Sequence, residues 1–275
     1  MPFLQSVSDT ALAVAFARAL ETERSDALFQ DPFARRLAGA QGEQIYHQIQ
    51  GDRSVGWLVT TRTCILDELI LYHIHQGIDT VLNLAAGLDT RPYRMALPAT
   101  LRWIEVDLPD LLEYKQERLA QAKPMCLLET IATDLTHREQ RHHLFSQISH
   151  TSKSVLVITE GLLVYLTPEQ VGSLATELDK QPNFSGWLTD LVSPLVAKLA
   201  QIRMEQEPAT NKIKLQFAPK DPNPFFQRYG WQLAASRSLW KEAHRLNREV
   251  PFGRLLRQFP MLNLSVVSLE QMKGN

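Results

Sequence analysis

The sequence predicts an α/β fold, in which a mainly parallel sheet carries helices on both faces. Beyond Gly77, short runs rich in β-branched and aliphatic residues alternate with helical stretches, and no such run precedes it. Alternation of this kind is typical of a parallel sheet. The length of 275 residues allows one sizeable domain with an insertion, and the 44% apolar and 21% charged contents are those of an ordinary globular protein.

The first 77 residues are expected to be helical. Ser8 is placed to cap one helix, Asp31-Pro32 to begin a second with proline at its first position, and Gly77 to end a third. The apolar run at residues 11–17 resembles the core of a signal peptide, but Asp9 precedes it and Arg18 interrupts it. It is therefore interpreted as part of an amphipathic helix.

Five β-rich runs define the predicted sheet, and a helix with a sharp start follows the fourth. Thr167-Pro168-Glu169-Gln170 supplies that start, because it combines a cap, a proline at the first helical position and a glutamine three residues after the cap. A last strand is expected at Leu262–Ser268, and Trp231 leads into another. The five runs are Thr80–Leu84, Leu101–Asp107, Cys126–Ile131, Ser154–Thr159 and Trp187–Leu191.

The rhythm of strands and helices breaks between Ser193 and about Pro224. This stretch holds five prolines and several basic residues, so an insertion is expected above the carboxyl ends of the strands, where open α/β sheets bind ligands. The chain is thus predicted to be a single domain. Its parts are an N-terminal helical cover (1–77), a cofactor-binding core (78–192), a lid insertion (193–224) and the C-terminal part of the core (225–275).

Charge and cysteine content exclude several classes of partner. The formal net charge is -1, which gives no global attraction to nucleic acid or to an anionic membrane. No apolar stretch reaches the ~20 residues of a membrane span. Cys64 and Cys126 lie far apart without histidine companions, so no metal site is expected, and buried free thiols in a reducing cytoplasm are predicted.

The run from Val81 to Arg91 and the acid that follows it form the central motif. Gly87 lies in a turn of small residues after the first strand, and Asp107 ends the next strand twenty residues later. Such a turn lets a nucleoside approach the backbone, and the acid can bind two ribose hydroxyls. A tight turn and a surface aspartate without function would give the same pattern, so this motif alone decides little.

Two more acids follow strands of the predicted sheet. Asp134-Leu135 comes just after the third, where the carboxylate and a backbone N–H together could bind adenine, and Glu160-Gly161 ends the fourth. With Asp107, these acids are expected over one edge of the sheet. Crowded carboxylates are costly unless a cation joins them.

Motifs along nearly the whole chain resemble those of the leucine carboxyl methyltransferase family, and especially its bacterial branch that includes polyketide O-methyltransferases similar to the tetracenomycin enzyme. Such a resemblance implies a class I methyltransferase with a Rossmann-like sheet, whose last strand is antiparallel, and S-adenosylmethionine as the cofactor whose ammonium and sulfonium join the acids. The motifs are Asp9-Thr10-Ala11, Asp31-Pro32, Arg62-Thr63, Ala86-Gly87-Leu88-Asp89-Thr90-Arg91, Val106-Asp107, Asp134-Leu135, residues 159–166 (TEGLLVYL) and Tyr229-Gly230-Trp231.

The resemblance also implies roles for individual residues. Arg62 would hold the cofactor carboxylate, Ala85 and Gly87 would pass the methionine portion, and Asp107 would bind the ribose. Asp134 and Leu135 would bind adenine, Glu160 would lie near the methionine end, and Arg18 would be a further contact. The chain departs from the family pattern at Ala85, where relatives have glycine, and at Asn83, where an acid is common.

No catalytic residue stands out. Tyr165 is a candidate for the acceptor pocket, although a packing aromatic is an equal interpretation, and Phe225 and Phe226 are expected to fill the core under the insertion. His73, His75, His142 and His143 fall on helical stretches, where solvated or packed histidines are the commoner case. A base-free site favours a carboxylate acceptor, which is already ionised at neutral pH, over a phenol.

The expected activity is methyl transfer to an oxygen, a carboxylate or a hydroxyl, of a small molecule such as a polyketide or another secondary metabolite. One or more of the basic residues of the insertion, Lys198, Arg203, Lys212 and Lys214, would attract an anionic acceptor, whereas solvated side chains on a loop are the commoner case for most of them. Methylation of a protein C-terminal carboxylate, a non-catalytic cofactor-binding protein and a nicotinamide-dependent oxidoreductase are the alternatives. The oxidoreductase is the weakest of these, because GxGxxG does not follow the first strand.

Overall fold

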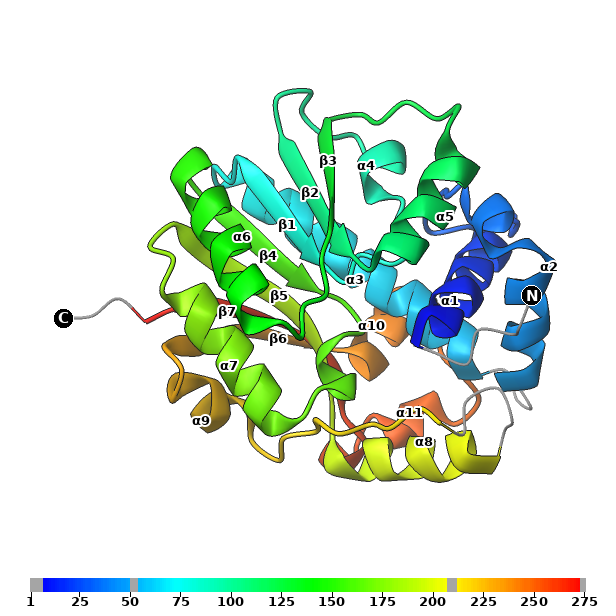
Figure 1. Ribbon diagram of the computed structural model, residues 1–275. Helices are drawn as coiled ribbons and strands as arrows, with labels where there is room; N and C mark the ends of the chain where they lie inside the picture. The colour runs from blue at the N-terminus through cyan, green and yellow to red at the C-terminus, as the bar shows by residue number, and fades with distance from the viewer. Residues whose placement is uncertain (1–6, 50–53, 207–211, 273–275) are drawn as a thin grey trace.

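The computed structural model describes residues 7–49, 54–206 and 212–272, which build a central seven-stranded sheet (Figure 1). The strand order is β3-β2-β1-β4-β5-β7-β6. Strands β1 to β5 pair in parallel, whereas β7 is antiparallel to β5 and β6. The prediction of a mainly parallel sheet with an antiparallel last strand is therefore confirmed. The strands are β1 (Thr80–Leu84), β2 (Arg102–Asp107), β3 (Leu127–Ala132), β4 (Val155–Thr159), β5 (Phe184–Val192), β6 (Trp231–Ser238) and β7 (Leu264–Gln271).

Helices cover both faces of the sheet. Apolar side chains of α6, α7 and α9 form one core with one face, and those of α3 and α10 form a second core with the other. In β1, Leu82 and Leu84 belong to the first core and Val81 to the second, because successive side chains point to opposite faces. The helices are α3 (Ser54–His75), α4 (Arg91–Arg94), α5 (Pro109–Leu119), α6 (Arg138–Thr151), α7 (Pro168–Asp179), α9 (Pro222–Gln227), α10 (Leu239–Arg245) and α11 (Gly253–Leu256).

Parallel pairing brings the carboxyl ends of β1 to β5 to one edge of the sheet. β4 is followed by the 3-10 turn η1 (Leu163–Tyr165) and then by α7, whose predicted capping box is present. The amide of Gln170 donates to the Thr167 hydroxyl at 3.2 Å, and the amide of Thr167 donates to the Gln170 side chain at 2.8 Å. These reciprocal bonds satisfy donors that a helix start otherwise leaves unpaired.

The N-terminal helices α1 (Val7–Thr22) and α2 (Ala34–Ile49) pack on each other and form a third core with Leu88 and Leu119. The helical character of this region is confirmed, but two predicted starts were wrong. α1 already includes Ser8, which is therefore not its cap. Asp31 and Pro32 form a turn before α2, where the Asp31 carboxylate accepts from the amide of Phe33 at 3.2 Å. Gly77 follows α3 with a φ of 100°, as a helix end requires.

The predicted insertion contains a helix that its broken periodicity hid. α8 (Pro194–Gln206) begins with proline at its first position, and Ser193 accepts from the amide of Val196 at 3.4 Å. A strap of residues 213–217 then runs between α8 and η1. Gln201 holds it on one side, because its amide accepts from the N–H of Leu215 at 2.8 Å and donates to the carbonyl of Ile213 at 3.2 Å.

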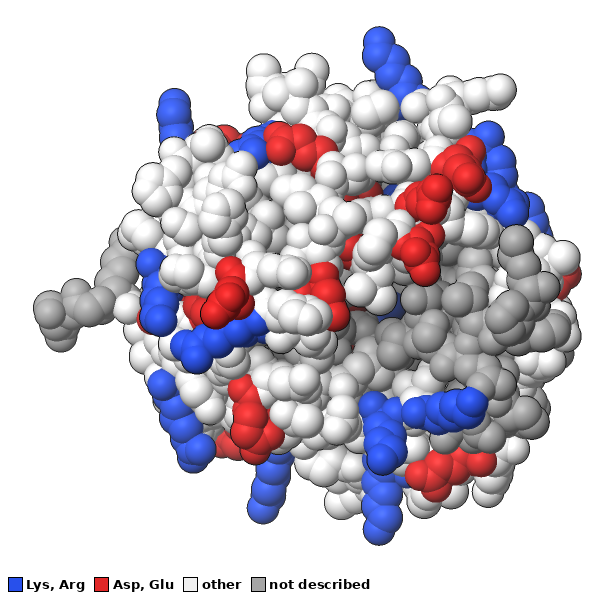
Figure 2. All heavy atoms as spheres, in the orientation of Figure 1, with Lys and Arg blue, Asp and Glu red and all other residues white. Residues whose placement is uncertain are grey.

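Charges of both signs are interspersed on the face shown in Figure 2. Among the described helices, none is long and apolar enough to cross a membrane. The described residues also contain no group of three or more histidine, cysteine or acidic side chains that could hold a metal ion. Cys64 and Cys126 are buried free thiols, as predicted.

Candidate active site

A cavity of about 1100 Å³ lies at the carboxyl ends of the strands. Ligand pockets usually measure ~300–1,000 Å³, so this cavity is at the large end of that range. Every residue that the sequence assigned to a cofactor site lines it, and so does Tyr165. The assigned residues are Arg18, Arg62, Ala85, Gly87, Asp107, Asp134, Leu135 and Glu160.

The turn after β1 has an unusual backbone. Both Ala85 (φ 54°) and Gly87 (φ 53°) adopt the left-handed conformation, which is costly for a residue with a Cβ atom. A Cβ atom at position 87 would lie 3.6 Å from the Cβ of Ala11, an ordinary contact. Among the protein's own atoms, glycine is therefore favoured at position 87 by its dihedral angle rather than by a lack of space.

Asp107 fixes this turn to the end of β2. Its carboxylate accepts from the amides of Gly87 at 2.6 Å and of Leu108 at 2.7 Å. Burial raises the pKa of Asp107 above its usual range, and the two N–H groups oppose that effect. The carboxylate thus lies at the cavity wall, between the turn and β2.

Asp134 and Leu135 lie at the rim of the cavity, after β3. The side chain of Asp134 is 40% exposed, and its carboxylate accepts from the amide and the hydroxyl of Thr136, both at 2.8 Å. These bonds lower its pKa. The carbonyl of Leu135 accepts from Arg141 at 2.6 Å.

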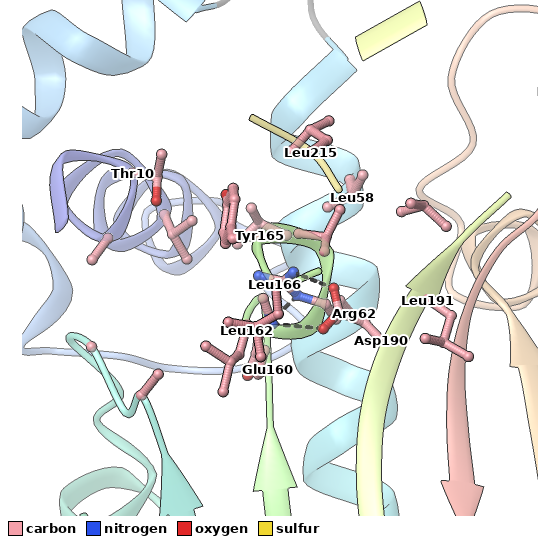
Figure 3. A pocket seen from close by; sticks show the side chains of 18 of the residues that line it. Thr10, Leu58, Arg62, Glu160, Leu162, Tyr165, Leu166, Asp190, Leu191 and Leu215 are labelled. Atoms are coloured by element: carbon pink, nitrogen blue, oxygen red, sulfur yellow. Dashed lines mark hydrogen bonds and ion pairs between the residues drawn. The ribbon is translucent and has the colours of Figure 1, made fainter. Parts of the chain in front are cut away.

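Arg62 of α3 joins the ends of β4 and β5. Its Nε lies 2.8 Å from the Glu160 carboxylate, and its Nη1 donates to Asp190 at 2.8 Å (Figure 3). The other oxygen of Asp190 accepts from the amide of Gly161 at 2.6 Å. Burial alone would lower the pKa of Arg62, but the two carboxylates raise it. Asp190 has no counterpart among the predicted site residues.

Arg91 extends this ion network to the other side of Glu160. It is 2% exposed and donates to Glu160 at 2.8 Å, to Asp89 at 2.9 Å and to Asp67 at 2.7 Å. Asp67 also accepts from Arg94 at 2.7 and 2.9 Å. Burial raises the pKa of Glu160, but the Arg91 and Arg62 guanidiniums outweigh it and lower that pKa below its ordinary value.

The expectation that a cofactor cation joins the strand-end acids was incomplete. Guanidiniums of the protein already join Glu160, and neither Asp107 nor Asp134 belongs to that network. Four carboxylates share three guanidiniums, which leaves one formal negative charge. The connected side chains are Asp67, Asp89, Glu160 and Asp190 with Arg62, Arg91 and Arg94.

Arg18 attaches α1 to the turn. It is 7% exposed, pairs with Asp31 at 2.9 Å and donates to the carbonyl of Leu88 at 2.6 Å. The Thr90 hydroxyl donates to the same Asp31 carboxylate at 2.6 Å. The Asp31-Pro32 motif therefore acts through Arg18, as a support for the cavity wall.

Of the other side chains considered in the sequence, Tyr165 lines the cavity and the phenylalanines and histidines do not. Tyr165 lines the cavity beside Leu166 and Arg62, and burial raises its pKa. Phe226 is fully buried in the first core with Phe225 packed against it, as expected. No histidine of the described residues lines the cavity; His73 packs near Ser268, where burial lowers its pKa.

Comparisons with known proteins agree with this geometry. The model of the leucine carboxyl methyltransferase family matches residues 11–179. A protein of Streptomyces coelicolor, provisionally named an S-adenosyl-L-methionine-dependent methyltransferase, is 30% identical over 262 residues, which cover 91% of this chain and 89% of that protein. A similarly named protein of Streptomyces avermitilis is 31% identical, with 88% of each chain covered.

Solved structures show the same fold at low sequence identity. A DUF574 family protein from Streptomyces avermitilis has a TM-score of 0.64 and 12% identity, covering 96% of this chain and 97% of that one. A crystal structure from Thermobifida fusca, provisionally named a methyltransferase, has a TM-score of 0.61 and 13% identity, covering 99% and 100%. The fold and the relatives favour methyl transfer over the nicotinamide-dependent alternative. The chain belongs to the leucine carboxyl methyltransferase family, and it is a methyltransferase that uses S-adenosylmethionine.

Proposed function

We propose that this methyltransferase acts on an oxygen of a small molecule, and that the oxygen belongs to a carboxylate rather than to a hydroxyl. The observation behind this choice is that no lining residue is left to act as a base: no described histidine lines the cavity, Glu160 and Asp190 both pair with Arg62, and Asp107 and Asp134 are assigned here to the cofactor. A carboxylate acceptor is ionised at neutral pH and needs no base, whereas a phenol must lose a proton. Secondary metabolites such as polyketides offer acceptors of both kinds.

Charge supports the binding of the cofactor here. The buried network carries one formal negative charge, and S-adenosylmethionine carries one net positive charge from its ammonium, sulfonium and carboxylate. The guanidinium of Arg62 has five N–H donors, so pairing with two acids leaves donors for a third carboxylate. When bound, the cofactor supplies an electrophilic methyl group on sulfur.

The other site residues would act as the family resemblance implies. Asp107 would bind the ribose hydroxyls, Asp134 and Leu135 the adenine, and the turn at Ala85 and Gly87 would pass the methionine portion, with Glu160 near its ammonium. Arg18 would act mainly by holding α1 against the turn. The raised pKa of Tyr165 keeps its hydroxyl protonated at neutral pH, so it can donate to an acceptor carboxylate but cannot serve as a base.

Orientation is the main contribution that these residues make to the rate. Well-aligned reactants gain up to ~7–11 kcal/mol, and the α1 and α8 walls would exclude water. That the N-terminal helices and the insertion together form a cover over the site remains a prediction. We also place the protein in the cytoplasm, because Cys64 and Cys126 are free thiols, and free thiols are typical of a reducing compartment.

The test is a turnover assay with methyl-labelled cofactor. Purified protein is given matched pairs of aromatic carboxylic acids and phenols, and any labelled product is treated with mild alkali, which hydrolyses a methyl ester but not an aryl ether. Alkali-labile product is expected. Alkali-stable product would refute the carboxylate assignment, and cofactor binding without turnover on small molecules or on C-terminal peptides would favour a non-catalytic binding protein.

A further inference from the structure

The cavity has a second half that the proposed cofactor residues do not reach. Those residues come from α1, α3 and the ends of β1 to β4, whereas the other half is lined by Trp57 of α3 and by residues from the end of β5 onward. Apolar side chains dominate it, and α8, α10, α11 and β7 supply most of them. They include Val192, Val196, Leu199, Trp240, Leu256 and Leu262.

A pair of tryptophans gives this half a flat aromatic surface. Trp57 of α3 and Trp240 of α10 stack with ring centroids 4.4 Å apart and planes inclined by 28°. The indole N–H of Trp240 donates to the carbonyl of Leu262 at 2.7 Å, which fixes its ring. A rigid, mainly apolar wall of this kind favours a ligand with an apolar body.

One cation in the lining has no carboxylate partner. Seven arginines line the cavity, and six of them pair with acids: Arg18, Arg62, Arg91, Arg94, Arg138 and Arg141. Within the described ranges, Arg203 makes no such pair. It is also the only arginine that the second half contributes.

The helical repeat explains why Arg203 differs from its basic neighbour. Val196, Leu199 and Arg203 recur at intervals of three and four residues, so they share the face of α8 that lines the cavity. Both basic side chains are exposed, but Lys198 does not line the cavity and Arg203 does. On the molecular surface in Figure 2, basic side chains lie near the place of α8 in Figure 1.

We propose that the second half of the cavity binds the methyl acceptor as an anion with a largely apolar body, whose charged group pairs with Arg203. Arg203 is exposed at the cavity, so its guanidinium is open to an incoming anion, and every other arginine of the described lining already has a carboxylate partner. That the ligand is a methyl acceptor rests on the proposed function. That an apolar anion binds here does not.

Two fluorescent dyes of similar shape test the proposal, anilinonaphthalene sulfonate, which is anionic, and phenylnaphthylamine, which is uncharged. Titration into the wild-type protein should show one site for each dye. Arg203→Gln should weaken the sulfonate about tenfold, the lower range for a hydrogen bond to a charged group, and leave the uncharged dye unchanged. Arg203→Lys should retain most of the sulfonate affinity, and Trp240→Ala should weaken both dyes.

Lys198→Gln is the matched control, because it removes the same charge from the outer face of α8. An equal loss of sulfonate affinity in Lys198→Gln and Arg203→Gln, or no loss in Arg203→Gln, would overturn the proposal. Calorimetry with S-adenosylhomocysteine, the demethylated cofactor, on the same variants should show unchanged affinity. If S-adenosylhomocysteine fails to bind the wild-type protein while the dye pattern holds, the proposed function fails and the anion site stands. If S-adenosylhomocysteine binds but Arg203→Gln leaves the sulfonate affinity unchanged, the anion site fails and the proposed function stands.

Discussion

Replacing Asp107 by alanine tests the link between the turn after β1 and cofactor binding. This carboxylate accepts from the amides of Gly87 at 2.6 Å and of Leu108 at 2.7 Å. Hydrogen bonds to a charged group contribute ~1.5–3 kcal/mol each, but water from the cavity can replace part of what is lost. We expect the free energy of unfolding to fall by about 1–3 kcal/mol.

The same substitution should weaken cofactor binding, because the ribose hydroxyls would lose their acceptor. A loss of about 1–3 kcal/mol corresponds to roughly 5–150-fold in the dissociation constant. Calorimetric titration with S-adenosylhomocysteine measures this quantity, and urea unfolding measures the stability separately.

Asp110→Ala is the control for Asp107→Ala. It removes the same charge three residues later, at an exposed position in the first turn of α5 that does not line the cavity. Its affinity for S-adenosylhomocysteine should equal that of the wild-type protein. A folded Asp107→Ala variant with undiminished affinity would refute the assignment of Asp107 to the ribose.

Three further predictions concern the frame around the site. Burial alone would raise the pKa of Asp89, but Arg91 and Lys115 outweigh burial and lower that pKa from 3.8 to about 2. About 2 kcal/mol of the free energy of unfolding, present above pH 4, should therefore be lost as the pH falls toward 2. Urea unfolding of Asp89→Asn should lack this pH dependence. Arg91→Gln leaves buried carboxylates without their partner and should cost about 3–5 kcal/mol in the same assay, and a cost below 1 kcal/mol would contradict the network. Gly172→Ala places a Cβ atom 2.5 Å from the Tyr229 ring and should lower the melting temperature by several degrees, since overpacking costs about 1–3 kcal/mol; an unchanged melting temperature would show that Tyr229 moves freely.

The parallel strands could be predicted from the sequence because they are buried on both faces. All five residues of β1 are buried, and three of them are aliphatic, with Thr80 and Asn83 as the buried polar residues. β3 was predicted as well, although it lies at the edge of the sheet and all of its residues are partly or fully exposed. β5 begins three residues before the predicted Trp187, because Phe184 and Gly186 already pair with β4.

The ion network could not be predicted in the same way. Arg91 contacts Asp67, which is 24 residues away in the sequence, and Glu160, which is 69 residues away. Local sequence patterns do not predict contacts between residues so far apart in the chain. In the sequence, Arg91 is the last residue of a motif and Asp190 is part of a predicted strand, and neither pattern predicts an ion pair. A usable signal does exist: an arginine beside a ligand-binding turn will need carboxylate partners if it is buried, because an unpaired buried charge is costly.

The network also gives a physical reason for one departure from the family pattern. The amide of Asn83 donates to the Asp89 carboxylate at 2.9 Å. An acid at position 83 would face that carboxylate and raise the formal charge of the network from one negative charge to two, unless one group took up a proton. Asparagine keeps the hydrogen-bonding shape and removes the repulsion. The residue that departs from the family's motif therefore suits the three-guanidinium arrangement of this chain, in which a single net positive ligand is enough to balance the site.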